Sequence, residues 1–481
     1  MIKKCKQEEQ SHNHPTTTVS QGTDLELSVS RVVVDEQIKK IQTKVQEIIN
    51  TEKSQYNISE KEKNNLKSQD VLAGLNNGED GDADLFIYYN RNKLLYDHSS
   101  ASWYVWKNSL WILDELNQHL VSFDPVIDIY AQEIRFQTDK LIKSANDRDS
   151  NAEQRAKKNI KELSSRIKKL QTLNRKKNIL KLAISGENSL GISGKEWDSH
   201  NDLLPCENGI VDLKTGDFRE NTPEDYIKSI APTIYKSLEI PAPNFLNAIN
   251  EIFDKNKALI FFVQKLLGSS ISGSITEHII PIFWGKGRNG KGTILELLKA
   301  VLGPLAGPIP SEMLLKQQNS RSSAGASPDI LSLKGKRLVW ASETEEGRYI
   351  DVSKLKWLSG GDTLIARGVY AKNFIEFTPT HTLFVLTNHK PHIPNNEYAM
   401  WQRILLIPFE LSFVDNPQKQ NERKRDPYLK DKLLKEKSGI LSWLIKGYLA
   451  WQREGLNPPT VVVQQTNQYK EDEDSIQTFI K

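Results

Sequence analysis

The feature that most restricts the fold of this chain is the segment HIIPIFWGKGRNGKGTILELLKAVLG, residues 278–303. An apolar run over residues 279–284 leads into a glycine-rich loop, and a helical pattern of apolar residues opens at Lys291. Gly285 and Gly290 stand with that lysine at the G-x-x-x-x-G-K spacing of a phosphate-binding P-loop. A strand, this loop and a helix in this order predict an α/β fold with a nucleotide site at the end of the strand.

The loop has the chemistry that a bound triphosphate requires. Its glycines let backbone N–H groups turn inward around the phosphates, and the helix N-terminus adds a partial positive charge. We expect Lys291 to reach the β- and γ-phosphates of ATP. The residues expected to bind the nucleotide are Gly285, Lys286, Gly287, Arg288, Asn289, Gly290, Lys291, Gly292 and Thr293.

The loop departs from the usual pattern at one position. Gly292 stands where Ser or Thr is expected, and a threonine follows one place later. Nucleotide kinases of the adenylate type also carry GKGT, so we expect the Thr293 hydroxyl to serve Mg²⁺ or the phosphates. The alternative is a glycine-rich turn that carries a lysine by chance, and the flanking strand and helix argue against it.

An acidic residue at the end of a second apolar strand is the candidate for catalysis. The segment LKGKRLVWASETEEG places a strand over residues 338–341 directly before Ser342 and Glu343. An acid in this place positions Mg²⁺ and polarises the attacking water. Glu343 is therefore the predicted metal ligand with Thr293, and Glu345 is the second choice. A surface cluster of acids is the alternative reading.

Two further polar residues stand beside apolar strands. The run HTLFVLTNHKP ends in Thr387 and Asn388, and an amide there can hold the lytic water beside the γ-phosphate. In MWQRILLIPF, Arg403 is a lone cation among apolar neighbours. A buried arginine needs an anionic partner. We expect that partner to be the γ-phosphate bound by a neighbouring subunit, which makes Arg403 an arginine finger.

The N-terminal half contains a polar tail and a mixed α+β region. Between residues 84 and 114, alternating aromatic and β-branched residues around Lys107 and Asn108 predict a β-hairpin. Asp82 and Asp84 superficially resemble the metal-binding acids of a polymerase, but they follow NNGEDG, which predicts a loop. An amphipathic helix with a basic outer face is expected between residues 155 and 181, as a solvated face or as a phosphate-contacting surface.

Composition excludes several classes of protein. The chain of 481 residues has 65 basic and 61 acidic residues, so anionic partners must be met by local patches. Two cysteines exclude a disulfide framework and a cysteine-based zinc site. No apolar run approaches the roughly 20 residues that span a bilayer. We expect a cytoplasmic protein, in a bacterial host cell or its equivalent, with no membrane partner.

The order of these motifs resembles the superfamily 3 helicases, specifically the helicase half of phage and plasmid primase-helicases related to the poxvirus primase-helicase. The resemblance spans about residues 80–481. It rests on ENGIVDLKTGDFRENTPEDYI, GKGRNGKGT, LVWASETEEGR, KLKWLSGGDTLIAR, FTPTHTLFVLTNHKP, WQRILLIPF and ILSWLIKGYLAWQREGLNPP. GDADLF and the hairpin at 103–114 resemble the start of the family's helicase-associated region.

The resemblance implies an AAA+-like P-loop core, ATP and Mg²⁺ as cofactors, and a ring hexamer moving 3′-to-5′ along single-stranded DNA. It implies that Lys291 is the Walker A lysine, Glu343 the Walker B acid, Asn388 sensor 1 and Arg403 the finger. The expected division is a polar tail over 1–78, a helicase-associated region over 79–244, the ATPase core over 245–415 and a helical part over 416–481. Residues 1–80 are too short and polar for a primase, and the chain ends before the winged-helix-like tail of many relatives, so a separate primase or loader is a further expected partner.

The resemblance also places the predicted DNA contact. Residues 363–366 and 374–377 can pair as a hairpin whose tip carries Arg367, Tyr370 and Lys372, and in superfamily 3 rings a hairpin in this interval enters the pore. The cations would meet phosphates and the tyrosine would stack on a base. The leading hypothesis is therefore a replicative helicase of a phage, plasmid or other mobile element, acting on single-stranded and forked DNA. The alternatives are a non-unwinding ATP-dependent DNA-binding switch of defence or partition type, and a small-molecule kinase.

Overall fold

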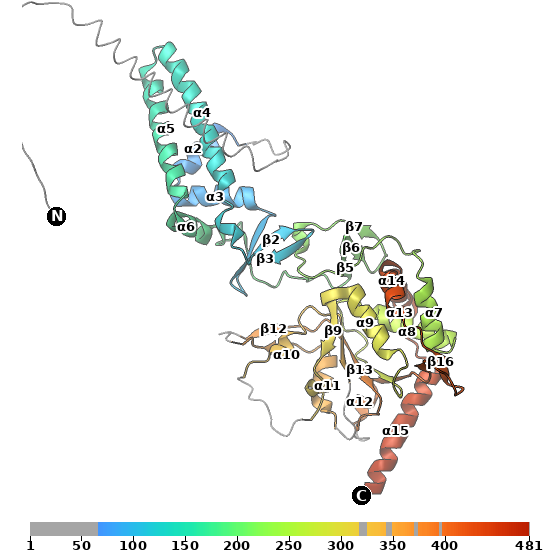
Figure 1. Cartoon of the computed structure of the whole chain (residues 1–481). Helices are drawn as coiled ribbons and strands as arrows, with labels where there is room; N and C mark the ends of the chain where they lie inside the picture. The colour runs from blue at the N-terminus through green and yellow to red at the C-terminus, as the bar shows by residue number, and fades with distance from the viewer. Residues whose placement is uncertain (1–65, 317–324, 343–348, 370–373, 394–396, 481) are drawn as a thin grey trace, which may run out of the picture. The chain divides into compact units, whose positions relative to one another are not determined.

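The strand that precedes the predicted P-loop lies in a five-stranded parallel sheet (Figure 1). The computed structural model describes residues 66–316, 325–342, 349–369, 374–393 and 397–480, with side chains to residue 473. The strands lie in the order β14-β8-β13-β10-β9, and every neighbouring pair is parallel. Their bounds are β8 Ile280–Trp284, β9 Ala306–Ile309, β10 Leu338–Ser342, β13 Thr382–Thr387 and β14 Ile404–Pro408. The predicted α/β class is confirmed in this sheet.

Both faces of the sheet are covered by helices, as a parallel sheet requires. Side chains alternate along β13: Leu383 and Val385 enter one apolar cluster, and Phe384 and Leu386 enter the other. The helices that supply the second cluster are α7 Pro243–Ile252, α8 Lys257–Ser269, α9 Lys291–Leu302, α13 Leu429–Leu434 and α14 Lys437–Glu454. The first cluster receives side chains from α11 Val352–Ser359, α12 Tyr398–Trp401 and α15 Thr460–Ile480.

The register of the strands brings the predicted motifs to one edge of the sheet. Thr387 and Pro408 both stand beside Trp284, and Ser342 stands beside Leu386. The P-loop, the acidic segment after β10 and Asn388 all follow these positions directly. Because parallel strands end at the same edge, the three segments meet there.

Short elements complete the part around this sheet. They are the helices η3 Gly303–Leu305, η4 Ser311–Met313 and α10 Pro328–Leu331, and the paired strands β11 Leu364–Ala366 with β12 Ile375–Phe377 and β15 Ser412–Val414 with β16 Glu422–Lys424. The β11–β12 pair is antiparallel, so the hairpin predicted at residues 363–377 is confirmed.

The residues before the core contain a group of helices and two small sheets. The helices are α2 Ser68–Asn76, α3 Gly78–Asn90, η1 Gln118–Leu120, α4 Asp124–Asn146, α5 Ser150–Leu170, α6 Leu173–Ala183 and η2 Pro223–Asp225. The sheets contain β1 Leu94–Asp97, β2 Ser102–Lys107, β3 Leu110–Leu113 and β4 Gly191–Ile192, and then β5 Leu203–Cys206, β6 Gly209–Asp212 and β7 Phe218–Arg219. Within the described residues, no helix is both long and apolar enough to cross a bilayer.

The hairpins predicted in this region are confirmed. Strands β2 and β3 pair antiparallel, and Asn108 and Ser109 between them both have positive φ, as a two-residue type I′ turn requires. Strands β5 and β6 pair antiparallel through the Asn208–Gly209 turn. The sequence between residues 197 and 221 therefore folds through its turn residues, as predicted.

The loop predicted around Asp82 and Asp84 is wrong. These residues lie in helix α3, and Asp82 is fully buried. Its carboxylate accepts hydrogen bonds from Tyr130 Oη at 2.7 Å, Arg166 Nη1 at 2.7 Å and Arg175 Nε at 2.8 Å. The ion pairs let this segment pack as a helix in the core rather than remain a solvated loop. A carboxylate held by two guanidinium groups is a structural anchor and not a polymerase metal ligand.

The single basic helix predicted between residues 155 and 181 is also corrected. Helix α5 ends at Leu170, Thr172 adopts an extended conformation, and α6 starts at the next residue. This break lets Arg175 return toward Asp82. Two cations of the basic stretch, Arg166 and Arg175, therefore point into the protein and not outward.

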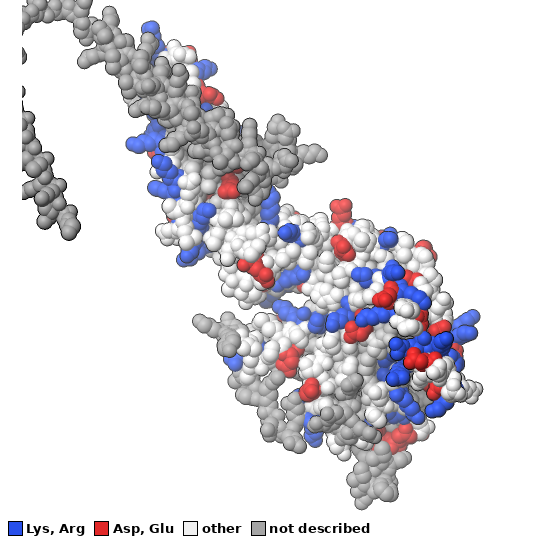
Figure 2. Space-filling model, in the orientation of Figure 1, with Lys and Arg blue, Asp and Glu red and all other residues white. Residues whose placement is uncertain are grey.

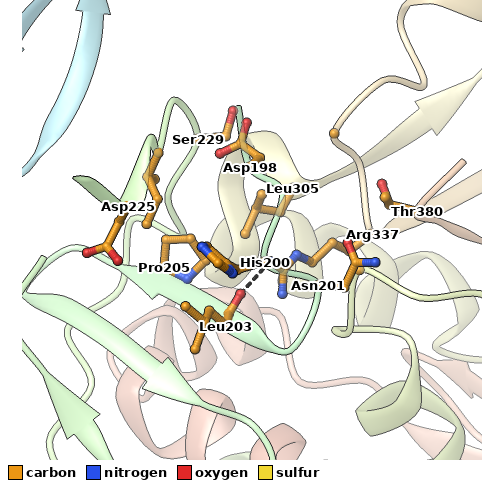
Figure 3. A pocket seen from close by; sticks show the side chains of 13 residues that line it. Asp198, His200, Asn201, Leu203, Pro205, Asp225, Ser229, Leu305, Arg337 and Thr380 are labelled. Carbon is orange, nitrogen blue, oxygen red and sulfur yellow. Dashed lines mark hydrogen bonds between the residues drawn. The ribbon is translucent and has the colours of Figure 1, made fainter. Parts of the chain in front are cut away.

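A buried arginine ties the region before the core to the sheet. Arg337, directly before β10, donates to the carbonyl of Ile271 at 2.7 Å and to that of Leu203 at 2.5 Å (Figure 3). Burial lowers its pKa to about 10. Beside it lies a cavity of about 30 Å³ that also contacts Asp198, whose pKa is raised by burial. The cavity has room for about one or two waters.

Candidate functional site

The P-loop forms as the sequence predicts, between β8 and α9. Its glycines are required at two places by space and by backbone conformation. A Cβ at Gly285 would lie 2.2 Å from the carbonyl oxygen of Phe409. Gly290 has φ +88, and a Cβ there would lie 2.7 Å from Ile252. The loop thus presses its backbone against its neighbours and leaves its inner side for a ligand.

The loop is fastened to the chain that follows β14. The buried side chain of Asn289 donates to the carbonyl of Phe409 at 3.2 Å, and the Phe413 N–H donates to the carbonyl of Arg288 at 2.7 Å. The side chains of Lys286 and Arg288 are exposed. Asn289 is therefore a support of the loop, whereas Lys286 and Arg288 are free to meet a ligand's charge.

Lys291 and Asn388 meet at the centre of the site. Lys291 Nζ donates to the Gly285 carbonyl at 2.6 Å and to Asn388 Oδ1 at 3.1 Å. The lysine is buried, with 7% of its surface exposed, and burial lowers its pKa from 10.5 to about 8. Two residues predicted from motifs 97 positions apart thus lie within hydrogen-bonding distance.

A pocket of about 330 Å³ opens in front of this pair. It is lined by residues 287–293 of the loop and helix, by Ser342, and by Leu386, Thr387 and Asn388. Nothing lies within 4 Å of a Cβ placed at Gly292, so the position where a P-loop usually carries a hydroxyl is open space. Within the described part of the chain, the hydroxyls of Thr293 and Ser342 face this pocket instead.

The donors fit Mg²⁺, which prefers oxygen ligands and keeps several of its waters. Thr293 and Ser342 supply hydroxyl oxygens beside Lys291. Glu343, Glu345 and Glu346 lie outside the described residues, and the predicted metal-binding role of Glu343 stays a prediction. The structure places the end of β10 at this pocket, so the segment that contains these acids starts there.

A second pocket, of about 750 Å³, adjoins the first and shares Arg288, Gly290 and Thr293 with it. Its apolar lining includes Ile252 and Phe413. Four more cations line it: Lys424, Arg425, Lys430 and Lys432. Figure 2 shows these blue side chains gathered over β16 and α13. Sequence reasoning missed this pocket, because its walls come from segments more than a hundred residues apart.

Arg403 lies at the opposite edge of the sheet. It precedes Ile404, which pairs with Ile280 at the start of β8, whereas the P-loop follows the end of β8. Six residue steps along the strand separate the level of Arg403 from that of Gly285, or about 20 Å at about 3.3 Å per residue. Arg403 therefore does not reach the phosphate site of its own chain.

The sequence argument for Arg403 assumed a buried cation without a partner in its own chain, and that premise is wrong. The side chain is half-buried, and its Nη1 donates to the carbonyl of Lys356 at 3.1 Å and to Ser359 Oγ at 3.2 Å. Both partners lie in the last turn of α11, where the helix carries partial negative charge. These neutral partners stabilise the guanidinium without a carboxylate.

The segment after Asn388 is held by the C-terminal helix α15. Lys390 forms an ion pair with Asp472 at 2.8 Å, and Glu473 accepts from the Ile393 N–H at 3.2 Å. Tyr469 is fully buried and donates to the carbonyl of Pro391. The position of Asn388 thus depends on a helix about 80 residues further along the chain, a support that no local motif reveals.

The predicted DNA hairpin is described at its strands and at part of its tip. Arg367 follows β11, exchanges backbone and side-chain hydrogen bonds with Ser327, and lies over the ring of Phe374 at 5.5 Å. Ile365 and Phe374 are about half exposed. Tyr370 and Lys372 lie outside the described residues, so their role stays a prediction.

Two family models match the chain. Residues 83–254 match a model described as "D5 N terminal like", and residues 283–403 match a family of unknown function, DUF5906. The first match covers the helical region and the two small sheets, and the second covers the parallel sheet from β8 to Arg403.

Three viral relatives extend the similarity. "Putative helicase L207/L206" of Acanthamoeba polyphaga mimivirus is 28% identical over 82% of this chain and 42% of its own length. "Putative helicase 184R" of Invertebrate iridescent virus 6 is 30% identical over 58% of this chain and 30% of its own. "Uncoating factor OPG117" of Vaccinia virus is 27% identical over 51% and 32%. The chain thus spans less than half the length of these curated relatives.

A solved structure, the apo C-terminal region of NrS-1, is similar over 79% of this chain and 71% of that one, with 13% identity and a TM-score of 0.46. The two family models match in the same order as the two halves of the structure, and the relatives share both halves. The chain belongs to the D5-type primase-helicase family.

Proposed function

We propose that the chain is an ATP-dependent DNA helicase that assembles as an AAA+-like ring hexamer and moves along single-stranded DNA during replication of a mobile element. The observation that carries the proposal is the meeting of Lys291 and Asn388 in the P-loop pocket. The viral relatives named as helicases support the choice of DNA as the second substrate. Because the chain spans only part of those relatives, the activity is a proposal for this chain.

The nucleotide is expected to occupy both pockets. The backbone N–H groups of the loop and the N-terminus of α9 bind the phosphates, and Lys291 moves from the Gly285 carbonyl to the β- and γ-phosphates. That leaves Asn388 free to orient the attacking water. The pocket between Ile252 and Phe413 receives the base, and the cations around it lie close to the phosphates and the ribose.

Mg²⁺, when bound, would neutralise the charge that develops on the phosphates. Thr293 and Ser342 would hold it or its waters, together with Glu343. In the same proposal, Glu343 takes the proton of the attacking water.

The position of Arg403 supports a ring. Since it lies about 20 Å from its own phosphate site along the strands, it can act as a finger only on a neighbouring subunit's nucleotide. The carbonyl and hydroxyl at the end of α11 hold it in place without neutralising its charge. It therefore keeps a full positive charge to offer a γ-phosphate across an interface.

DNA is expected to meet the β11–β12 hairpin in the pore of this ring. Arg367 and Lys372 would contact phosphates and Tyr370 would stack on a base. The hairpin strand β12 is joined to β13 by a short link, and β13 ends at Asn388. A change at the γ-phosphate can therefore be passed along one strand to the DNA contact.

The test is ATP hydrolysis with and without single-stranded DNA, in the wild-type chain and in Glu343→Gln and Lys291→Ala. We expect DNA to stimulate hydrolysis in the wild type. Glu343→Gln should bind ATP without turnover, and Lys291→Ala should lose turnover. Hydrolysis that DNA leaves unchanged, with phosphoryl transfer to a small acceptor, would favour the kinase alternative. DNA-stimulated hydrolysis without strand separation would favour the non-unwinding switch.

A further inference from the structure

Helix α5 concentrates positive charge on one side. Ala156, Leu163 and Leu170 recur at seven-residue intervals and are buried. The opposite side, which we call the basic face, carries six exposed cations: Arg155, Lys157, Lys158, Lys161, Lys168 and Lys169. Figure 2 shows blue side chains along the side of α5 that is turned away from α4.

Few acids balance this charge. Glu153 pairs with Lys157 at 2.5 Å, and Glu162 approaches Lys158 at 3.9 Å. Within the described part of the chain, the other four cations of the basic face form no ion pair. The whole chain has a net charge of only +4, so the concentration on this helix is a local feature.

The same basic stretch also shows what a structural cation does here. Arg166 and Arg175 turn inward and bind the buried Asp82. The six cations of the basic face have no such task. Like charges one helical turn apart, such as Lys157 and Lys161, destabilise a helix by about 0.2–0.5 kcal/mol per pair. An anionic ligand would remove that cost.

We propose that the basic face binds the phosphodiester backbone of nucleic acid outside the pore of the ring. From Arg155 to Lys169 the helix rises about 21 Å, at about 1.5 Å per residue. This length spans about six phosphates of one strand, at about 3.4 Å per charge. The face reads charge and not sequence, since Gln154 is its only side chain with an amide.

The chemistry of the face argues against other occupants. Between the cations lie Gln154 and Ser165, and no apolar side chain interrupts the exposed side. A membrane-bound helix would present an apolar stripe beside its cations. A stable protein interface would present an apolar or aromatic centre. A polyanion needs only the charges that are present.

The experiment uses the whole chain and two variants with equal loss of charge. The face variant is Arg155→Gln, Lys161→Gln, Lys168→Gln and Lys169→Gln. The control variant is Lys107→Gln, Lys195→Gln, Lys236→Gln and Lys435→Gln, at four exposed sites outside the helix. Glutamine keeps helix propensity close to that of lysine, so both variants should fold. Fluorescence anisotropy measures binding of a labelled duplex and of a labelled single strand over a series of KCl concentrations.

We expect the face variant to bind more weakly and with a flatter slope of log affinity against log salt. Each lost phosphate contact should remove about 0.9 from the slope on duplex and about 0.7 on a single strand. Four contacts would therefore remove about 3.6 or about 2.8. The control variant should keep the wild-type slope. The larger effect on duplex or on single strand identifies the form of DNA that the face meets.

A face variant that matches the control variant on both DNA forms would overturn the inference. The inference rests on the proposed function in its choice of DNA, and the two can be told apart. If the face variant binds like the wild type while the wild type still unwinds DNA with ATP, only the inference fails. If the wild type binds no DNA in any salt, both fail. Basal ATP hydrolysis, measured on the same samples, should be equal in all three proteins.

Discussion

Lys291 should make nucleotide binding depend on pH in a defined window. In the free protein, burial lowers the pKa of this lysine from 10.5 to about 8. A bound triphosphate favours the charged ammonium, which returns the pKa of Lys291 in the complex to about 10.5 or higher. Binding therefore takes up a proton at any pH between these two values. Below pH 8 the lysine is charged in both states and affinity is independent of its titration.

The magnitude follows from the two pKa values. Above about pH 8, affinity should fall about tenfold per pH unit, because the free protein must first be protonated. From pH 8 to pH 9.5 the loss is about 30-fold. Over the full interval of 2.5 units it approaches about 300-fold. The phosphates of ATP do not titrate in this range, so the lysine is the source of the change.

The assay is anisotropy of a fluorescent ATP analogue, measured from pH 7.5 to 9.5 without Mg²⁺. Calorimetry in two buffers of different ionisation enthalpy counts the proton directly. Lys291→Met should bind more weakly at pH 7.5 and show no such dependence. An affinity that stays constant to pH 9.5 in the wild type would refute the buried, neutralisable lysine.

Three further changes test the parts that surround this lysine. Gly292→Ala should raise the free energy of unfolding by about 0.5–1 kcal/mol, because the site is open and helical, whereas Gly290→Ala, with its positive φ, should lower it by more than about 1 kcal/mol; equal melting temperatures would contradict this. Asp82→Ala should lower the free energy of unfolding by about 3–5 kcal/mol in denaturant titrations, since two buried arginines lose their partner, and a change below 1 kcal/mol would dismiss the anchor. Arg403→Ala should bind nucleotide and lose hydrolysis, and mixing it with Lys291→Ala should restore part of the ATPase. No recovery after verified subunit exchange would exclude action between subunits.

Local patterns carried the prediction of the core. The P-loop, the strands around it and the hairpins depend on residues close together in the sequence, such as the apolar run before Gly285 and the turn at Asn108. Because parallel strands end at one edge, the meeting of Lys291 with Asn388 followed from two local patterns. The segment with Glu343 could be placed after β10 for the same reason.

Long-range polar contacts could not be predicted. Asp82 is separated by 84 residues from Arg166 and by 93 from Arg175, and no periodicity links them. A helix of mixed polar and apolar residues was therefore read as a loop. The same holds for the hold of Glu473 on the segment after Asn388, and for the partners of Arg403 in α11. In each case a side chain that looked solvated or unpaired has its partner far away in the chain.

The most direct measurement of the central proposal is the rate at which the wild-type chain displaces a labelled strand from forked DNA as ATP is varied. We predict displacement that rises with ATP to a plateau, requires Mg²⁺ and disappears in Lys291→Ala, with the fold of the variant intact by circular dichroism. Displacement that is absent while ATP is hydrolysed, or that persists in Lys291→Ala, would contradict an ATP-driven helicase built on this site.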